Sequence, residues 1–181
     1  LDQALDLNTL GPGRLLEFAR AGGGLYVHIS TAYVSGQRAG LIPEKLLDPL
    51  EAIDAQLPSG ASRPSRFDVH EEIAYLTNLI RDVKGDFEKQ CRQKGLNPDS
   101  EQAIKQLRTS LVSAGMRRAQ SFGWSDTYTY TKFLGEQLVK LTRGAVPTVI
   151  VRPSIIESSL REPEPGWLDG LRMADPLIIG F

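Results

Sequence analysis

The sequence predicts an α/β fold of the parallel-sheet kind with a helical insertion. Two short apolar runs, 25–29 and 148–151, are typical of buried strands, and polar residues follow each of them. The continuous apolar run 148–151 predicts a parallel strand covered on both faces. A helix beginning near Asp126 lies between these strands, and a wide helical stretch, residues 36–122, separates it from the first strand. Strands that alternate with helices in this way favour parallel layering.

The first element is a predicted helix over residues 1–20, because leucines recur there at helical spacing. Pro12 lacks a backbone N–H, so we expect it to bend or break this helix near Thr9. The glycines 22–24 should end it. These glycines follow a helix and precede a strand, the reverse of the order in a phosphate-binding loop, so we reject a dinucleotide site there.

The middle of the chain predicts a short helix around 44–56 and then an antiparallel helical hairpin, 66–94 and 98–122. Asn97 is expected to cap the second helix of this hairpin, with Pro98 at the first helical position. A coiled-coil partner is the alternative, but the heptad-like pattern covers only about three heptads. The apolar residues at helical spacing in the first helix of the hairpin are Val69, Ile73, Leu76, Ile80, Val83 and Phe87.

The helix from Asp126 to Gly144 carries a pair of side chains with a possible chemical use. Ser125 or Asp126 can accept the amide hydrogens of its first turn. Tyr128 and Lys132 are one turn apart and leave on the same face. A positive charge beside a phenol favours the phenolate, which eases proton exchange. The ordinary alternative is a surface tyrosine beside a solvated lysine.

Polar residues follow both predicted strands. In open α/β sheets ligands bind at the carboxyl ends of the strands, where Ser30-Thr31 and Arg152-Pro153-Ser154 stand. The hydroxyls could bind a substrate carbonyl, although satisfying local backbone groups is their commoner use. His28, within the strand, is more simply a satisfied core or face histidine than a catalytic one. A short helix near 168–173 is also expected.

Composition excludes several classes of function. The 181 residues carry a net charge of −1, which favours neither nucleic acid nor an anionic membrane. No apolar run approaches the roughly 20 residues of a membrane span. The single Cys91 leaves no disulfide and no metal cluster. These features fit a cytoplasmic protein.

Four ordered segments resemble the extended short-chain dehydrogenase/reductase superfamily and, more closely, its fatty acyl-CoA reductases of the male-sterility type. Asn8 also matches the helix asparagine of that superfamily. The segments are His28-Ile29-Ser30-Thr31-Ala32-Tyr33-Val34; Gly123-Trp124-Ser125-Asp126-Thr127-Tyr128-Thr129-Tyr130-Thr131-Lys132; Val151-Arg152-Pro153-Ser154-Ile155-Ile156-Glu157-Ser158; and Glu162-Pro163-Glu164-Pro165-Gly166-Trp167.

This resemblance implies a Rossmann-like sheet and NADPH-dependent reduction of long-chain fatty acyl-CoA to aldehyde or alcohol. Thr31, Tyr128 and Lys132 would be catalytic, with Tyr128 as proton donor. The same Tyr128 and Lys132 would contact the cofactor. Further cofactor contacts are implied for Ser30, Pro153, Ser154 and Ile155.

The glycine-rich turn that opens this family has no match here, and the chain begins at Leu1 rather than Met. We therefore expect residues 1–181 to be an internal fragment of one reductase domain, without the dinucleotide-binding half and inactive alone. A nucleotide-sugar epimerase or dehydratase and a non-catalytic fragment stay open as alternatives. The oligomeric state and acyl chain length stay open as well.

Overall fold

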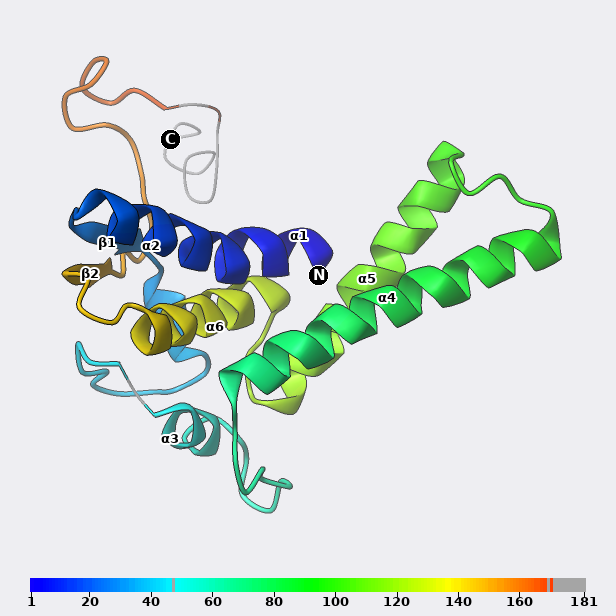
Figure 1. Ribbon diagram of the computed structural model, residues 1–181, viewed down its shortest axis with the longest axis horizontal. Helices are drawn as coiled ribbons and strands as arrows, with labels where there is room; N and C mark the ends of the chain where they lie inside the picture. Colours follow the sequence, from blue (N-terminus) through cyan, green and yellow to red (C-terminus); the bar gives the residue numbers. More distant parts are fainter. Residues whose placement is uncertain (47, 169, 171–181) are drawn as a thin grey trace, which may run out of the picture.

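The computed structural model describes residues 1–46, 48–168 and 170. Figure 1 shows a body formed by the sheet and two long helices, from which a helical arm projects. This arrangement confirms the predicted α/β class with a parallel sheet. The elements in order are α1 (Asp2–Ala4), η1 (Leu5–Leu10), α2 (Gly11–Gly22), β1 (Tyr26–Ile29), η2 (Ala32–Ser35), α3 (Pro49–Asp54), α4 (Val69–Lys94), α5 (Glu101–Ser121), α6 (Thr127–Thr142) and β2 (Thr148–Val151).

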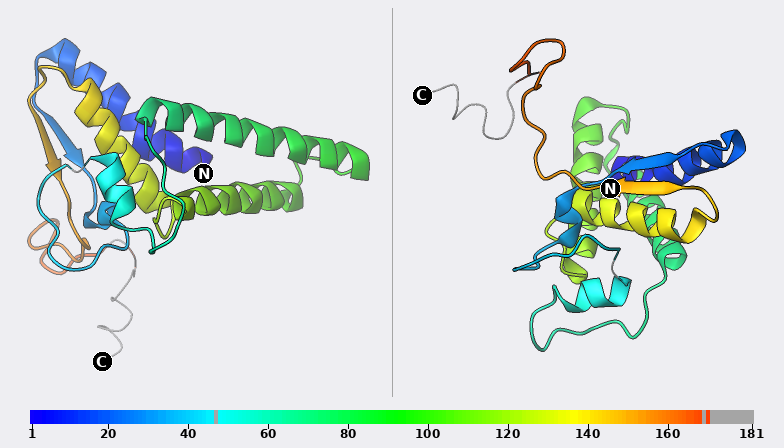
Figure 2. Two further views of the ribbon diagram at one scale, coloured as in Figure 1. Left: turned by 90° about the horizontal axis from the view of Figure 1, so that it is seen from below. Right: turned by 90° about the vertical axis from the view of Figure 1, so that its left-hand side faces the viewer.

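The two strands pair in parallel, in a register that sets Val27 beside Val149 and Ile29 beside Val151. Helices α2 and α6 both lie on one side of this sheet (Figure 2), where Leu16 and Val139 pack against Tyr26. The prediction that 148–151 is covered on both faces is wrong for the described residues, since Val149 and Val151 stay 47% and 42% exposed. Their β1 neighbours are exposed on that same face.

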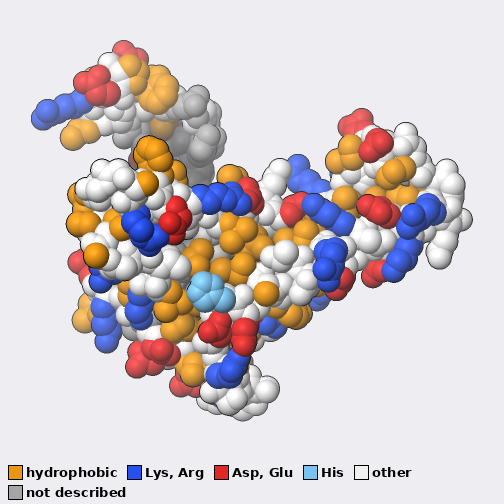
Figure 3. Space-filling model, viewed as in Figure 1, with side chains coloured by type: hydrophobic (Ala, Val, Ile, Leu, Met, Phe, Trp, Pro, Cys, Tyr) orange, Lys and Arg blue, Asp and Glu red, His pale blue; other side chains and the backbone are white. Residues whose placement is uncertain are grey.

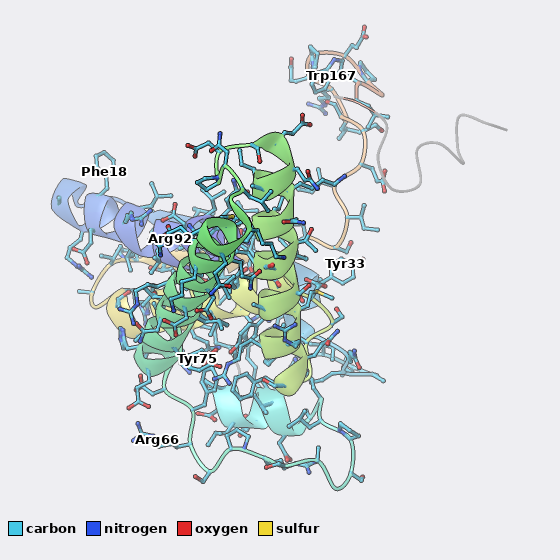
Figure 4. The ribbon with its side chains drawn as sticks, turned by 90° about the vertical axis from the view of Figure 1, so that its right-hand side faces the viewer. Phe18, Tyr33, Arg66, Tyr75, Arg92 and Trp167 are labelled. Atoms are coloured by element: carbon cyan, nitrogen blue, oxygen red, sulfur yellow. The ribbon has the colours of Figure 1, made fainter. Side chains whose placement is uncertain are left out.

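The first helix is widened rather than broken. Residues Leu5–Leu10 form a π-helix that runs directly into α2, so the predicted break near Thr9 is wrong. Pro12 cannot donate to the carbonyl four residues earlier, and a π-helical stretch absorbs that loss. Helix α2 ends as predicted, because Gly23 has a φ of 65° in the left-handed region. In the C-terminal half of α2, Phe18 projects into solvent (Figure 4).

Helix α6 lies at the centre of the molecule. Asp126 caps it, as predicted, by accepting the amide hydrogen of Thr129 at 2.7 Å. One side of α6 contacts η1 closely: a Cβ added at Gly135 would lie 2.1 Å from the carbonyl oxygen of Asn8. Only glycine permits that approach, so Gly135 sets how near the two helices come.

The projecting arm is the predicted antiparallel hairpin of α4 and α5 (Figure 1). The predicted cap Asn97 is wrong: Ser100 caps α5 by accepting from Ala103, whereas Asn97 forms a local turn by accepting from Asp99. Acidic and basic side chains alternate along the arm's surface (Figure 3), as its polar face in the sequence predicts. The short helix expected around 44–56 is α3, Pro49–Asp54.

A buried polar group joins the arm to α6. The carboxylate of Glu72 forms two hydrogen bonds with Arg118, at 2.9 and 2.5 Å, and accepts a third from the hydroxyl of Tyr130 at 2.8 Å. The guanidinium of Arg118 also lies 4.0 Å from the ring centre of Tyr75. Beside this group Trp124 packs on Phe133 within the main core.

Within the described residues no helix is long and apolar enough to cross a bilayer. The short helix expected near 168–173 falls mostly outside the described residues.

Candidate active site

The two polar segments that follow the strands lie side by side. The amide of Ser30 donates to the carbonyl of Val151 at 2.8 Å, and the amide of Ala32 donates to that of Pro153 at 2.9 Å. These bonds continue the parallel ladder beyond both strands, so the hydroxyls at 30–31 lie next to the 152–154 segment. The sequence predicted this common edge from the parallel layering alone.

Thr31 and Ser30 differ in what their hydroxyls contact. Thr31 is buried and caps η2, its Oγ1 accepting the amide hydrogen of Tyr33 at 3.3 Å. A hydroxyl oxygen that accepts a bond still has its own hydrogen to donate. Ser30 is equally buried, and among the described residues its Oγ has no hydrogen-bond partner. Buried polar atoms are seldom left unpaired, which points to a ligand-binding edge.

Lys132 reaches this edge from α6. Its ammonium donates to the carbonyl of Ile29, the last residue of β1, at 3.1 Å. Burial lowers the pKa of Lys132 below that of an ordinary lysine, and the carboxylate of Glu136 partly opposes the change. Tyr128 lies one turn earlier on α6, and 49% of its surface is exposed.

A second tyrosine in the same helix, Tyr130, faces the other way. It is buried against the arm, and its hydroxyl donates to Glu72. Burial, followed by the charge of Glu72, raises the pKa of Tyr130 well above its ordinary value. Tyr130 is therefore a structural residue, and Tyr128 is the tyrosine on the face of Lys132.

Glu136 and Arg152 form an ion pair that the sequence reading missed. Glu136 is fully buried on α6, and both its oxygens accept from Arg152, at 2.8 and 2.5 Å. This bidentate pair fixes the start of the 152–154 segment against α6. A signal was present: Glu136 stands four residues after Lys132, and a carboxylate among the leucines of a buried helix face needs a cationic partner.

His28 is buried in β1, on the sheet face that α6 covers. Its Nδ1 lies 3.5 Å from the hydroxyl of Tyr26, and its Nε2 has no partner among the described residues. Burial lowers the pKa of His28, the charge of Lys132 lowers it further, and Glu136 opposes both. Of the two expected positions, core and sheet face, His28 thus takes the core, although no described residue satisfies its Nε2 there.

We expect His28 to make stability depend on pH. Above about pH 6.5 the imidazole is neutral in both states, but below it the unfolded chain binds a proton that folded His28 does not. The free energy of unfolding should therefore fall as the pH drops from about 7.5 to about 5.5. Urea unfolding at these two values checks this: His28→Gln should weaken the dependence, whereas the exposed His70→Gln should keep it. Equal pH dependence in His28→Gln and wild type would contradict the assignment.

Asn8 lies beside the site rather than in it. Its side-chain amide donates to the hydroxyl of Thr131 at 3.1 Å, and Thr9 donates to the Thr131 carbonyl at 2.8 Å. Both bonds hold η1 to the turn of α6 that carries Lys132. Asn8 therefore contacts α6 and not the described residues at the sheet edge.

Comparisons with known proteins agree with the resemblance. A model of NAD-binding domains, described as male sterility protein, matches residues 1–181. "Fatty acyl-CoA reductase 2, chloroplastic" from Arabidopsis thaliana is 40% identical over 183 residues, covering 99% of this chain and 26% of its own length. "Alcohol-forming fatty acyl-CoA reductase" from Simmondsia chinensis is 32% identical over 176 residues, covering 96% of this chain and 31% of its own length. The chain thus spans about a quarter to a third of these relatives.

Proposed function

This chain belongs to the male sterility protein family, and from that premise we propose that the intact protein reduces long-chain fatty acyl-CoA thioesters with NADPH. The product is a fatty aldehyde or alcohol. The observation that supports this most is the meeting of three segments at one sheet edge: Lys132 at the end of β1, and residues 30–32 bonded to residues 151–153. The named relatives support the substrate class.

Residues at this edge fit a nicotinamide nucleotide. An ammonium has three donors, and the Ile29 carbonyl takes one from Lys132, so donors remain for ribose hydroxyls. The unpaired Oγ of Ser30 offers a further polar contact. Pro153, Ser154 and Ile155 would lie along the ring, where the bond from Ala32 to Pro153 holds the backbone. When bound, the nucleotide supplies the hydride.

The side chains would act on the substrate carbonyl. Thr31, whose oxygen already accepts from Tyr33, points its remaining hydrogen toward the developing oxyanion and stabilises it. Tyr128 donates a second hydrogen bond and then its proton. The charge of Lys132 stabilises the phenolate that remains. Loss of coenzyme A as the thiol, which takes the proton with it, would yield the aldehyde. A hydride from a second NADPH would then reduce the aldehyde to the alcohol, with Tyr128 again as proton donor.

Turnover by the intact protein tests this proposal. We expect NADPH oxidation that depends on palmitoyl-CoA, with fatty aldehyde or alcohol as product, and none with UDP-glucose. Mass spectrometry of the products separates this reaction from sugar epimerisation, the second function that the superfamily resemblance allows. Activity on UDP-glucose alone would show that the substrate class is wrong, and turnover with NADH in place of NADPH would change the cofactor.

The compartment belongs to the proposal as well. Composition favours the cytoplasm, whereas the relative at 40% identity is named chloroplastic. Imaging of the tagged intact protein decides between them.

A further inference from the structure

A pocket of about 750 Å³ lies beside the sheet edge, between η2, the loop 42–46 and the end of β2. Its wall includes Ser154 of the segment assigned to the cofactor, but neither Tyr128 nor Lys132. Tyr33, which also lines it, lies at the margin of the molecule, apart from Tyr75 on the arm (Figure 4). The pocket therefore adjoins the reaction site and is distinct from it.

Three cationic side chains line this pocket: Arg38, Lys45 and Arg152. Arg152 is held in place by the buried Glu136, and its Nη1 also donates to the carbonyl of Lys45 at 3.4 Å. The Nε of Arg38 donates to the carbonyl of Ser35 at 3.2 Å, which fixes the side chain's direction. Arg38 and Arg152, which are far apart in the sequence, thus present two oriented guanidinium groups to one pocket.

The charges in the pocket are not balanced by its own wall. Among the described lining residues, Glu44 is acidic against the two cations Arg38 and Lys45, whereas Glu136, which is not in the wall, compensates the charge of Arg152. Burial lowers the pKa of Arg38, and the positive charge of Arg152 lowers it further, which reflects how near the two guanidiniums lie. Like charges brought together in this way favour a bound anion.

The rest of the wall is apolar. Ile42, Pro43 and Leu46 lie beside the cations, and Ile150 and Val151 contribute from β2. A small inorganic anion would leave most of this surface unused. A ligand with a phosphate and an apolar arm would fill both parts, because guanidinium groups match phosphate oxygens in pairs and the arm buries apolar area.

We propose that the pocket lined by Arg38, Lys45 and Arg152 is a subsite for the phosphate-bearing end of a coenzyme. This rests on the proposed function, which supplies two such ends: the nucleotide-pantetheine part of the acyl thioester and the dinucleotide. Either one would enter beside Ser154 and extend toward the carbonyl at Thr31.

The variant Arg38→Met/Lys45→Met in the intact protein tests the subsite. Arg152 is left unchanged, because its removal would leave Glu136 buried without a partner. We compare kcat/KM for palmitoyl-CoA with that for palmitoyl-N-acetylcysteamine, a thioester without phosphate. If coenzyme A supplies the phosphate, the variant should lower the preference for palmitoyl-CoA about 10-fold or more, as expected for two lost charge contacts. If the dinucleotide supplies it, the preference should stay and the KM for NADPH should rise by a similar factor with both thioesters. The charge-matched control Lys105→Met/Arg108→Met, on α5, should keep the wild-type preference.

Equilibrium binding gives a readout that does not depend on turnover. Titration calorimetry with coenzyme A alone and with NADPH alone should show weaker binding of one of them in the variant, and that one is the source of the phosphate. The variant Arg38→Lys/Lys45→Met, which keeps a cation at position 38, should recover part of the lost affinity. Unchanged binding of both together with an unchanged thioester preference would overturn the subsite. Failure of wild type to reduce either thioester, with coenzyme binding still weakened in the variant, would instead reject the proposed function alone.

Discussion

The Tyr128→Phe variant of the intact protein should reduce palmitoyl-CoA about 100- to 10,000-fold more slowly than wild type, with little change in KM. This range is the usual contribution of a positioned proton donor. Phenylalanine removes the one hydroxyl and leaves the ring, so the packing at the start of α6 is unchanged. Single-turnover NADPH oxidation measures the effect on the chemical step itself.

Two tyrosines of the same chain serve as matched controls. Tyr75→Phe, on the arm and outside the site, removes a hydroxyl from a half-exposed side chain and should change kcat by less than about threefold. Tyr130→Phe breaks the buried bond to Glu72, so it should lower the unfolding temperature more than it lowers kcat. A Tyr128→Phe enzyme that matches Tyr75→Phe in rate would falsify the role of Tyr128 as proton donor.

Glu136→Leu should lower the free energy of unfolding by about 3 kcal/mol, the lower end of the range for breaking a buried ion pair. The carboxylate is fully buried, and its loss leaves Arg152 unpaired on the inner side of the sheet edge. The side chain of Arg152 keeps 22% of its surface exposed, so solvent relieves part of the cost. Urea unfolding of wild type and variant gives the difference.

The double variant Glu136→Leu/Arg152→Met separates this pair from simple loss of packing. It removes both charges, so it should be more stable than Glu136→Leu alone, and the two changes should be strongly non-additive. Glu88→Gln on the exposed face of α4 controls for loss of a negative charge and should change stability by less than about 0.5 kcal/mol. Additive effects in the double variant would contradict the pairing.

The structure confirms the features that depend only on local sequence and regular geometry. A spacing of four puts Tyr128 and Lys132 on one face of any helix, and Asp126 caps that helix through contacts within three residues. Parallel layering then brings the residues after both strands to one edge, as the bonds from Ser30 and Ala32 show. Each of these inferences needs only geometry that every helix or parallel sheet has.

The parts that depend on distant elements were missed or wrong. Glu136 is explained by Arg152, which comes from another element, and no local pattern identifies that partner. The apolar run 148–151 predicted two covered faces, yet which face α2 and α6 cover is decided by the packing of the whole chain. The π-helix at Leu5–Leu10 likewise accompanies close contact with Gly135, far away in the sequence.

A crystal structure of the intact protein with NADP⁺ and a palmitoyl-CoA thioether analogue tests the convergence of β1 and α6 most directly. We expect the atom standing for the carbonyl oxygen to lie about 2.6–3.2 Å from both the Thr31 and Tyr128 hydroxyls, with the Lys132 ammonium against the ribose. An analogue bound with its reacting atom away from Thr31, on the far side of the sheet or against the arm, would contradict the account.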